Sequence, residues 1–164
     1  MESRDLWIRI GLGATAGLAG TCALQLIRKA NEKWIPEGSP PMQGDPAGFM
    51  LRRTKESFPE RVREKIPRSA EQALMKLLPL GYGMSFGALY ATARPTIRRE
   101  AGEGVLLGLI CWAVGFLGWL PKTGLLPPIW EHKPKQIVRP IVEHALYGVA
   151  TVEGYRWLKR LARA

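Results

Sequence analysis

Charged residues are excluded from three stretches of the chain. Residues 10–27, 77–93 and 104–120 contain no Asp, Glu, Lys, Arg or His, and each run is 17 or 18 residues long. At about 1.5 Å per helical residue, such a run and its flanking residues span a hydrocarbon layer of roughly 30 Å. A fourth stretch, residues 140–155, is apolar except for Glu143, His144 and Glu153.

This pattern predicts four helices, over about 6–30, 70–93, 102–120 and 137–157, in a single membrane domain covering 1–164. We expect an all-α fold, an integral membrane four-helix bundle with an additional short interfacial amphipathic helix between the first two spans. The alternative is a soluble domain with three buried helices. It fits the pattern less well, because soluble helices normally keep one polar face.

Glycines recur four residues apart in each of the first three helices. The pairs are Gly13 and Gly17, Gly83 and Gly87, and Gly104 and Gly108. In lipid, small residues at this spacing let two helix backbones approach closely and gain dispersion contacts. We predict that these six residues mark helix-packing faces, although glycine is common in membrane helices in any case.

The long connection between the first two helices contains a second pattern, over about 49–66. Apolar Phe58, Val62 and Ile66 recur four residues apart among cations. A short helix of this kind lies well in a headgroup plane. The candidate lipid-headgroup contacts are Arg52, Arg53, Arg61, Arg63 and Lys65. The alternative is a solvated helix that docks on another subunit.

Two Ser residues in the same connection predict helix starts. Ser57 is followed three residues later by Glu60, and Ser69 by Gln72, a spacing at which both side chains bond the first free N–H groups of a helix.

Charge and composition indicate the kind of partner. The chain has 24 Lys and Arg and a formal net charge of +10. Beside membrane spans, these cations match anionic lipid headgroups better than nucleic acid, at about 1 kcal/mol for each near-surface cation. Membrane lipids, and other membrane-protein subunits, are therefore the expected partners. The cations fall on both sides of the four spans and do not decide the orientation.

The fourth helix carries the candidate intramembrane polar site, formed by Glu143, His144, Tyr147 and Glu153. At about 100° per residue, His144 and Glu153 point to opposite faces. One interpretation is structural: Glu143 pairs with Lys122, Arg139 or the backbone, and Glu153 pairs with Arg156. The other is functional: Glu143 and His144 line a polar cavity that exchanges protons or binds a small ligand.

No catalytic, cofactor or metal site is indicated. The chain has only two histidines, His132 and His144, and both cysteines, Cys22 and Cys111, lie in apolar runs. Neither a zinc site nor a Ser-His-Asp triad can be assembled from these residues. We therefore do not expect an enzyme.

The last third of the chain combines several features. The segment 120–128 reads Leu-Pro-Lys-Thr-Gly-Leu-Leu-Pro-Pro, and a polar hinge, Glu143-His144 with Tyr147, Glu153 and Arg156 follow it. Over roughly 104–160 this arrangement resembles the YagU-like family of bacterial inner-membrane proteins. The resemblance implies a small multi-pass helical protein of the bacterial inner (plasma) membrane. The molecular function of that family is not assigned, and it has a loose association with acid tolerance. Carried over by motif, the resemblance implies that His144, Glu153 and the Pro127-Pro128 turn are the functional positions of this chain.

Two functions remain open at this point. The first is a non-enzymatic accessory or scaffold subunit that packs through its glycine faces and binds anionic lipid or a larger membrane complex. The second is a small transporter, channel or proton-responsive protein that uses Glu143 and His144.

Overall fold

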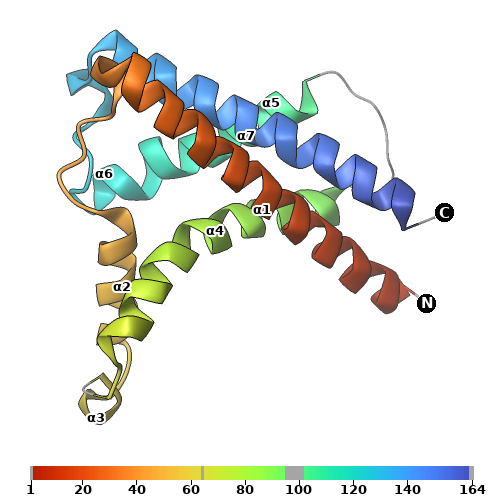
Figure 1. The fold of residues 1–164 in the computed structure, drawn as a ribbon, viewed down its shortest axis with the longest axis horizontal. Coiled ribbons are helices and arrows are strands. Elements are labelled where there is room, and N and C mark those ends of the chain that lie inside the picture. The colour runs from red at the N-terminus through yellow and green to blue at the C-terminus, as the bar shows by residue number, and fades with distance from the viewer. Residues whose placement is uncertain (1, 64, 95–101, 163–164) are drawn as a thin grey trace.

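The computed structural model describes residues 2–63, 65–94 and 102–162, and every regular element in these ranges is helical (Figure 1). The elements are α1 (Glu2–Trp34), η1 (Pro36–Gly38), α2 (Pro46–Glu56), α3 (Glu60–Arg63), α4 (Arg68–Ala93), α5 (Glu103–Ala113), η2 (Val114–Trp119), α6 (Leu120–Lys122), η3 (Ile129–Glu131) and α7 (Pro134–Leu161). The all-α prediction is confirmed. The described ranges contain four long helical segments, because α5, the π-helical η2 and α6 follow one another without interruption.

The four long segments pack in the order α4, α1, α7, α5. Helix α1 lies against both α4 and α7, α7 also lies against α5, and α4 and α5 contact each other little. Figure 1 shows the start of α1 and the end of α7 at one end of the molecule, called here the terminal end. The connections 35–45 and 123–133 lie at the opposite end, called here the hinge end.

Glycines bring α1 and α4 together. An added Cβ on Gly17 would overlap the Gly83 carbonyl oxygen, and one on Gly87 would lie 2.8 Å from the Gly17 nitrogen. One on Gly13 would overlap both the Gly87 carbonyl and Ala91. Only hydrogen fits at these positions, so the two backbones touch directly.

Glycines also form the contact between α5 and α7. A Cβ on Gly104 would lie 2.6 Å from the Val149 Cα, and one on Gly108 would lie 2.8 Å from the Ala145 Cα. On the facing helix, a Cβ on Gly148 would overlap the Gly104 carbonyl oxygen. All six glycines singled out in the sequence therefore lie at helix contacts within the chain, and Gly148 is a seventh.

The segment 49–66 differs from the single interfacial helix that the sequence predicted. Helix α2 begins at the N-cap Asp45, whose carboxylate accepts from the Gly48 N–H at 2.9 Å, and ends at Ser57. The short α3 follows after Pro59. Ser57 therefore ends a helix rather than starting one, because its hydroxyl bonds back to the Thr54 carbonyl at 2.6 Å.

Helix α4 also starts differently from the prediction. Pro67 occupies the N-cap position and no side chain caps the helix, so Ser69 already lies inside it. Pro79 lies within α4, where it cannot donate a backbone hydrogen bond, and Figure 1 shows α4 bent along its length. Helix α2 packs against α4, and an ion pair between Lys55 and Glu71 joins them.

The third helix ends in a reversal built on Gly124. This residue has φ +72°, a conformation that favours glycine. The N–H of Leu125 donates to the Leu120 carbonyl at 3.0 Å, and that of Gly124 donates to Pro121 at 3.1 Å. This is the Schellman pattern of helix ends, and it folds Leu125 and Leu126 back onto Leu120 in a buried cluster. The helix runs to Lys122, two residues past its predicted end at Leu120.

By length and composition, two helical stretches in the described part of the chain are apolar enough to cross a membrane. They are Arg4–Trp34 and Glu103–Lys122.

Candidate functional site

Glu143 is the most deeply buried carboxylate of the described residues, at 2 % exposure. Its Oε1 accepts hydrogen bonds from Arg139 Nε at 2.7 Å and from Asn31 Nδ2 at 2.9 Å. Its Oε2 lies 3.5 Å from Arg28 Nε. Two guanidinium groups, one from α1 and one from α7, thus face a single carboxylate between the two helices.

Arg139 extends this network to the connection after α1. One Nη donates to the Ile35 carbonyl and to Ser39 Oγ, both at 2.9 Å, and the other lies 3.4 Å from the Arg28 carbonyl. The last carbonyls of a helix have no partner within the helix. Arg139 supplies donors to this region while its Nε holds Glu143, so it joins the end of α1 to the start of α7.

His144 does not share a site with Glu143. Its Nδ1 lies 2.7 Å from the Pro140 carbonyl, and its ring meets Phe116 edge-on with centroids 5.6 Å apart. The imidazole therefore faces η2, whereas the Glu143 carboxylate faces α1. Neighbouring positions on a helix differ by about 100°, and this rotation separates the two side chains.

Tyr147 connects α7 to a third helix. Its side chain is buried, and its hydroxyl donates to the Gly83 carbonyl of α4 at 2.7 Å. On α1, a Cβ added at Gly20 would lie 2.9 Å from the Tyr147 carbonyl oxygen and 3.1 Å from Cδ2 of its ring. The absence of a side chain at Gly20 therefore leaves room for this ring beside α1.

Glu153 belongs to a second network near the terminal end. It is paired with Arg156 at 2.5 Å, as the structural interpretation had it. Arg156 also contacts the buried Glu103 at 2.6 Å, and Glu103 contacts Arg94 at 2.9 Å and the hydroxyl of Tyr90 at 3.1 Å. Glu143 and Glu153 lie about 15 Å apart along α7 at 1.5 Å per residue, so they belong to separate sites.

Sequence reasoning did not single out Glu103, Arg28 or Asn31. Glu103 stands one residue before an uncharged run, and Arg28 and Asn31 follow another. This position is the only signal, and it does not distinguish a buried acid from a solvated helix end.

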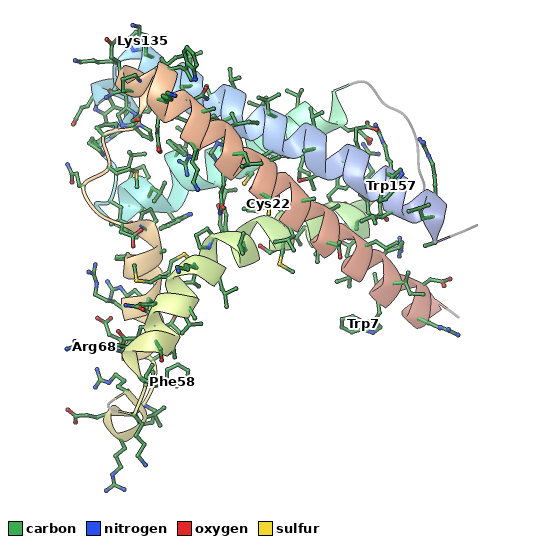
Figure 2. All side chains as sticks on the ribbon, viewed as in Figure 1. Trp7, Cys22, Phe58, Arg68, Lys135 and Trp157 are labelled. Carbon is green, nitrogen blue, oxygen red and sulfur yellow. The ribbon has the colours of Figure 1, made fainter. Side chains whose placement is uncertain are left out.

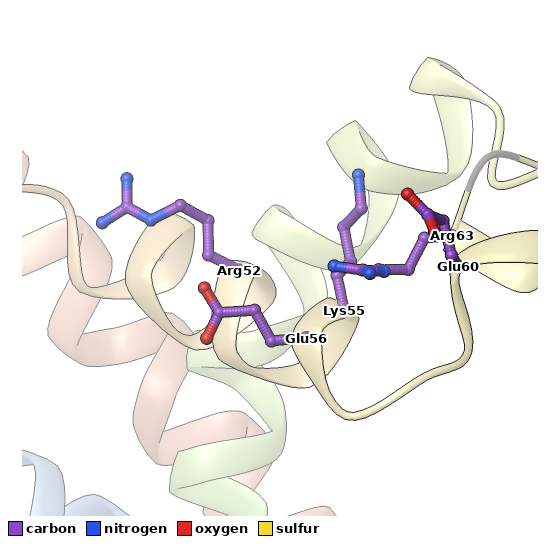
Figure 3. Close-up of a pocket in the computed structure, with 5 residues that line it drawn as sticks. All are labelled: Arg52, Lys55, Glu56, Glu60 and Arg63. Atoms are coloured by element: carbon purple, nitrogen blue, oxygen red, sulfur yellow. The ribbon is translucent and has the colours of Figure 1, made fainter.

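The basic segment forms an open hollow of about 400 Å³, lined by Arg52, Lys55, Glu56, Glu60 and Arg63 (Figure 3). Acidic side chains lie among the cations, and Arg53 pairs with Glu56 at 3.1 Å. Phe58 and Val62 are exposed beside them. The surface is therefore both basic and apolar, and part of its charge is already neutralised. The predicted headgroup contacts Arg61 and Lys65 are exposed as well.

Among the described residues, no group of three or more His, Cys, Asp or Glu is placed to hold a metal ion. His132 is buried in the hinge, with Nε2 3.0 Å from the Pro127 carbonyl.

Comparisons with protein-family models, curated proteins and solved structures returned no match for this chain. The resemblance to the YagU-like family remains a prediction.

Proposed function

We propose that the protein is a non-enzymatic, four-span integral membrane protein that serves as an accessory or scaffold subunit and binds anionic lipid. The observation that carries this proposal is the distribution of side chains. Large apolar residues lie on the outside of each long helix, and glycines and ion pairs lie between the helices.

The outward apolar residues are distributed over all four long helices. Leu26 on α1, Leu89 on α4, Leu106 on α5 and Val138 on α7 are each more than half exposed. Buried side chains include Glu103, Glu143, Thr151, Arg156 and Lys159. A water-soluble fold rarely exposes a large continuous apolar surface and rarely buries charged side chains. In a bilayer, lipid tails solvate the apolar exterior and ionisable groups face the bundle interior.

Exposed tryptophans lie at both ends of the bundle. Trp7 and Trp157 are at the terminal end, where Figure 2 shows Trp7 directed away from the helices. Trp34 and Trp130 are at the hinge end, and the four side chains are 59 % to 81 % exposed. Along α1, Trp7 and Trp34 are about 40 Å apart at 1.5 Å per residue. This spacing matches a bilayer with its headgroup regions, where tryptophan is enriched.

Several charged residues lie along α7. Arg139, Glu143 and Arg156 belong to the two buried networks, whereas the exposed Lys135 and Arg160 lie near the ends of the helix. Glu143 and Arg156 are both paired inside the bundle, which lowers the cost of placing them in a membrane. This pairing supports counting α7 as a span, and the uncharged run 77–93 supports counting α4.

The basic hollow on α2 and α3 supports the binding of anionic lipid. The cations and the exposed Phe58 and Val62 are adjacent there, which suits a surface between headgroups and acyl chains. As a scaffold subunit, the protein could equally use this surface to bind a larger membrane complex.

The alternative role in transport or proton response has less support. It needs Glu143 and His144 in one polar cavity, whereas Glu143 is bonded to Arg139 and Asn31 and His144 faces Phe116.

The test is membrane extraction followed by lipid binding. We expect the chain, expressed in bacteria, to stay in the membrane fraction after alkaline carbonate washing and to require detergent for release. Purified in mild detergent with equal amounts of phosphatidylglycerol and phosphatidylcholine, the protein should retain more phosphatidylglycerol. Arg61→Glu with Arg63→Glu should reduce that preference, and the control Lys122→Glu at the hinge end should not. Release by carbonate would refute the membrane assignment, and equal retention of the two lipids would refute the lipid role.

Identification of chains that co-purify in mild detergent tests the accessory role. A partner retained by the parent protein and lost with the α2–α3 variants would place the subunit contact on that surface.

A further inference from the structure

Two hollows adjoin at the hinge end, where α1 ends and α7 begins. The first, of about 460 Å³, has walls of Ile35, Val138 and Val142, with Asn31 and Arg139 also lining it. The second, of about 640 Å³, is lined by polar residues that include Lys133, Glu37 and Ser39. Both include Pro134 and Lys135, so they form one groove with an apolar part and a polar part.

The order of residues along the groove follows the expected depth in a bilayer. On α7, Val142 lies farthest from the hinge end, Val138 lies one turn nearer, and Lys135 lies at the start of the helix. Figure 2 shows Lys135 at the extremity of the molecule. The exposed Trp34 and Trp130 belong to the same end, so the polar part lies at headgroup level and the apolar part at acyl-chain level.

The polar part carries a net positive charge. Lys135 Nζ bonds Glu37 Oε2 at 2.7 Å, and Lys133 is near the same carboxylate. The hydrogen bond from Lys135, the charge of Lys135 and that of Lys133 hold the pKa of Glu37 below its usual value. Two ammonium groups thus face one carboxylate at the mouth.

The inner wall adds no further free charge. Arg139 lines the apolar part, but Glu143 neutralises its charge. One Nη of Arg139 donates to the Ile35 carbonyl and to Ser39 Oγ. The excess cation is therefore at the mouth, where a phosphate would lie.

We propose that this groove is a specific site for one anionic phospholipid of the surrounding bilayer. One acyl chain lies along Ile35, Val138 and Val142, and the phosphate lies between Lys133 and Lys135. The proposal rests on the membrane setting proposed above. Lipid tails gain little by moving from bilayer to groove, so the preference for this lipid comes from the headgroup. One net cation corresponds to about a fivefold selection of an anionic over a zwitterionic lipid.

The test is photo-crosslinking of the full chain in phosphatidylcholine vesicles. The probe is phosphatidylglycerol with a diazirine on one acyl chain, and peptide mass spectrometry locates the adducts. We expect adducts concentrated in residues 31–35 and 134–142, displaced by unlabelled phosphatidylglycerol several-fold more effectively than by added phosphatidylcholine.

Two pairs of variants sharpen the result. Val138→Trp fills the groove and should abolish these adducts, whereas Leu146→Trp, at an exposed position farther along α7, should leave them. Lys133→Ala should remove most of the headgroup preference, whereas Lys122→Ala should not. Circular dichroism confirms that each variant is folded.

Adducts spread evenly over the exposed apolar positions of all four helices would overturn the site while leaving the membrane assignment intact. So would adducts that survive Val138→Trp. Failure of the parent protein to enter vesicles at all would overturn the membrane assignment, and the site with it.

Discussion

Replacement of Gly87 by alanine tests the glycine contact between α1 and α4. The new Cβ would overlap the Gly13 carbonyl oxygen and lie 2.8 Å from the Gly17 nitrogen and 2.9 Å from its Cα, where ordinary contacts begin near 3.4 Å. All of these atoms are backbone, so no side chain can rotate away. The helices must separate, and every contact along the interface weakens.

Helix propensity and the backbone clash change the stability of Gly87→Ala in opposite directions. Alanine is a better helix former than glycine by about 1 kcal/mol, so substitution without a clash should stabilise the protein. Overpacking of a tight contact costs about 1–3 kcal/mol. We therefore expect Gly87→Ala to lower the free energy of unfolding by up to about 2 kcal/mol, and to be about 1–3 kcal/mol less stable than a Gly→Ala change on the same helix that meets no clash.

Two glycines on the same two helices provide matched controls. Gly81 on α4 and Gly11 on α1 have no atom within 4 Å of an added Cβ. Gly81→Ala and Gly11→Ala should be neutral or stabilising by up to about 1 kcal/mol. The assay is reversible unfolding in mixed micelles with increasing dodecyl sulfate, followed by helical circular dichroism. Equal stability of Gly87→Ala and Gly81→Ala would refute the close approach of the two helices.

Two further predictions concern the buried network and the hinge. Arg139→Ala leaves the buried Glu143 with only the more distant Arg28 as a cationic partner, and should lower the free energy of unfolding by about 3–5 kcal/mol in the same assay. Removing both charges with Arg139→Met and Glu143→Leu should restore most of that loss. A double variant no more stable than Arg139→Ala would contradict this account. Gly124→Ala places a side chain at φ +72° and should lower the free energy of unfolding by about 1–2 kcal/mol. Gly118→Ala should not lower it, because an added Cβ there makes only an ordinary van der Waals contact. Equal effects of the two substitutions would show that the reversal does not depend on Gly124.

The proposed lipid site and the Glu143 network have different roles in the same region. Arg139 closes the contact between α1 and α7, and its hydrogen bonds to Ile35 and Ser39 hold the connection that forms one wall of the groove. Loss of Arg139 should therefore disturb both stability and lipid selection. Loss of Lys133, which is exposed, should disturb lipid selection alone.

Helix positions could be read from the pattern of charged and apolar residues. The predicted segments 6–30, 70–93, 102–120 and 137–157 lie within the observed helical segments to within one residue at the start of α5. Charge exclusion and proline spacing are local properties, so they are visible without any partner helix. The predicted helix starts failed at both Ser residues: Ser57 is the C-cap of α2, and Ser69 lies inside α4, whose N-cap is Pro67.

The chemistry of the interior was much less accessible. Glu143 was recognised as unusual, and Arg139, one turn earlier on the same helix, was among its expected partners. The other two partners of Glu143, Arg28 and Asn31, lie more than 100 positions away in the chain. Glu103 of α5 pairs with Arg156 of α7. Such pairs depend on the rotation and axial register of packed helices, which no local pattern records.

Local sequence alone established that the chain is helical, where its long helices run, and which helix faces are small enough for close packing, because each of these follows from neighbouring residues. Packing in three dimensions settled which faces meet: Gly13 and Gly17 lie against α4, Gly104 and Gly108 lie against α7, and α4 and α5 barely touch. It also gave each side chain its partner: Glu143 lies against Arg28 of α1, and His144 lies against Phe116 of η2. The physical reason is that a helix contact is a property of two surfaces, and a sequence displays each surface without showing its partner.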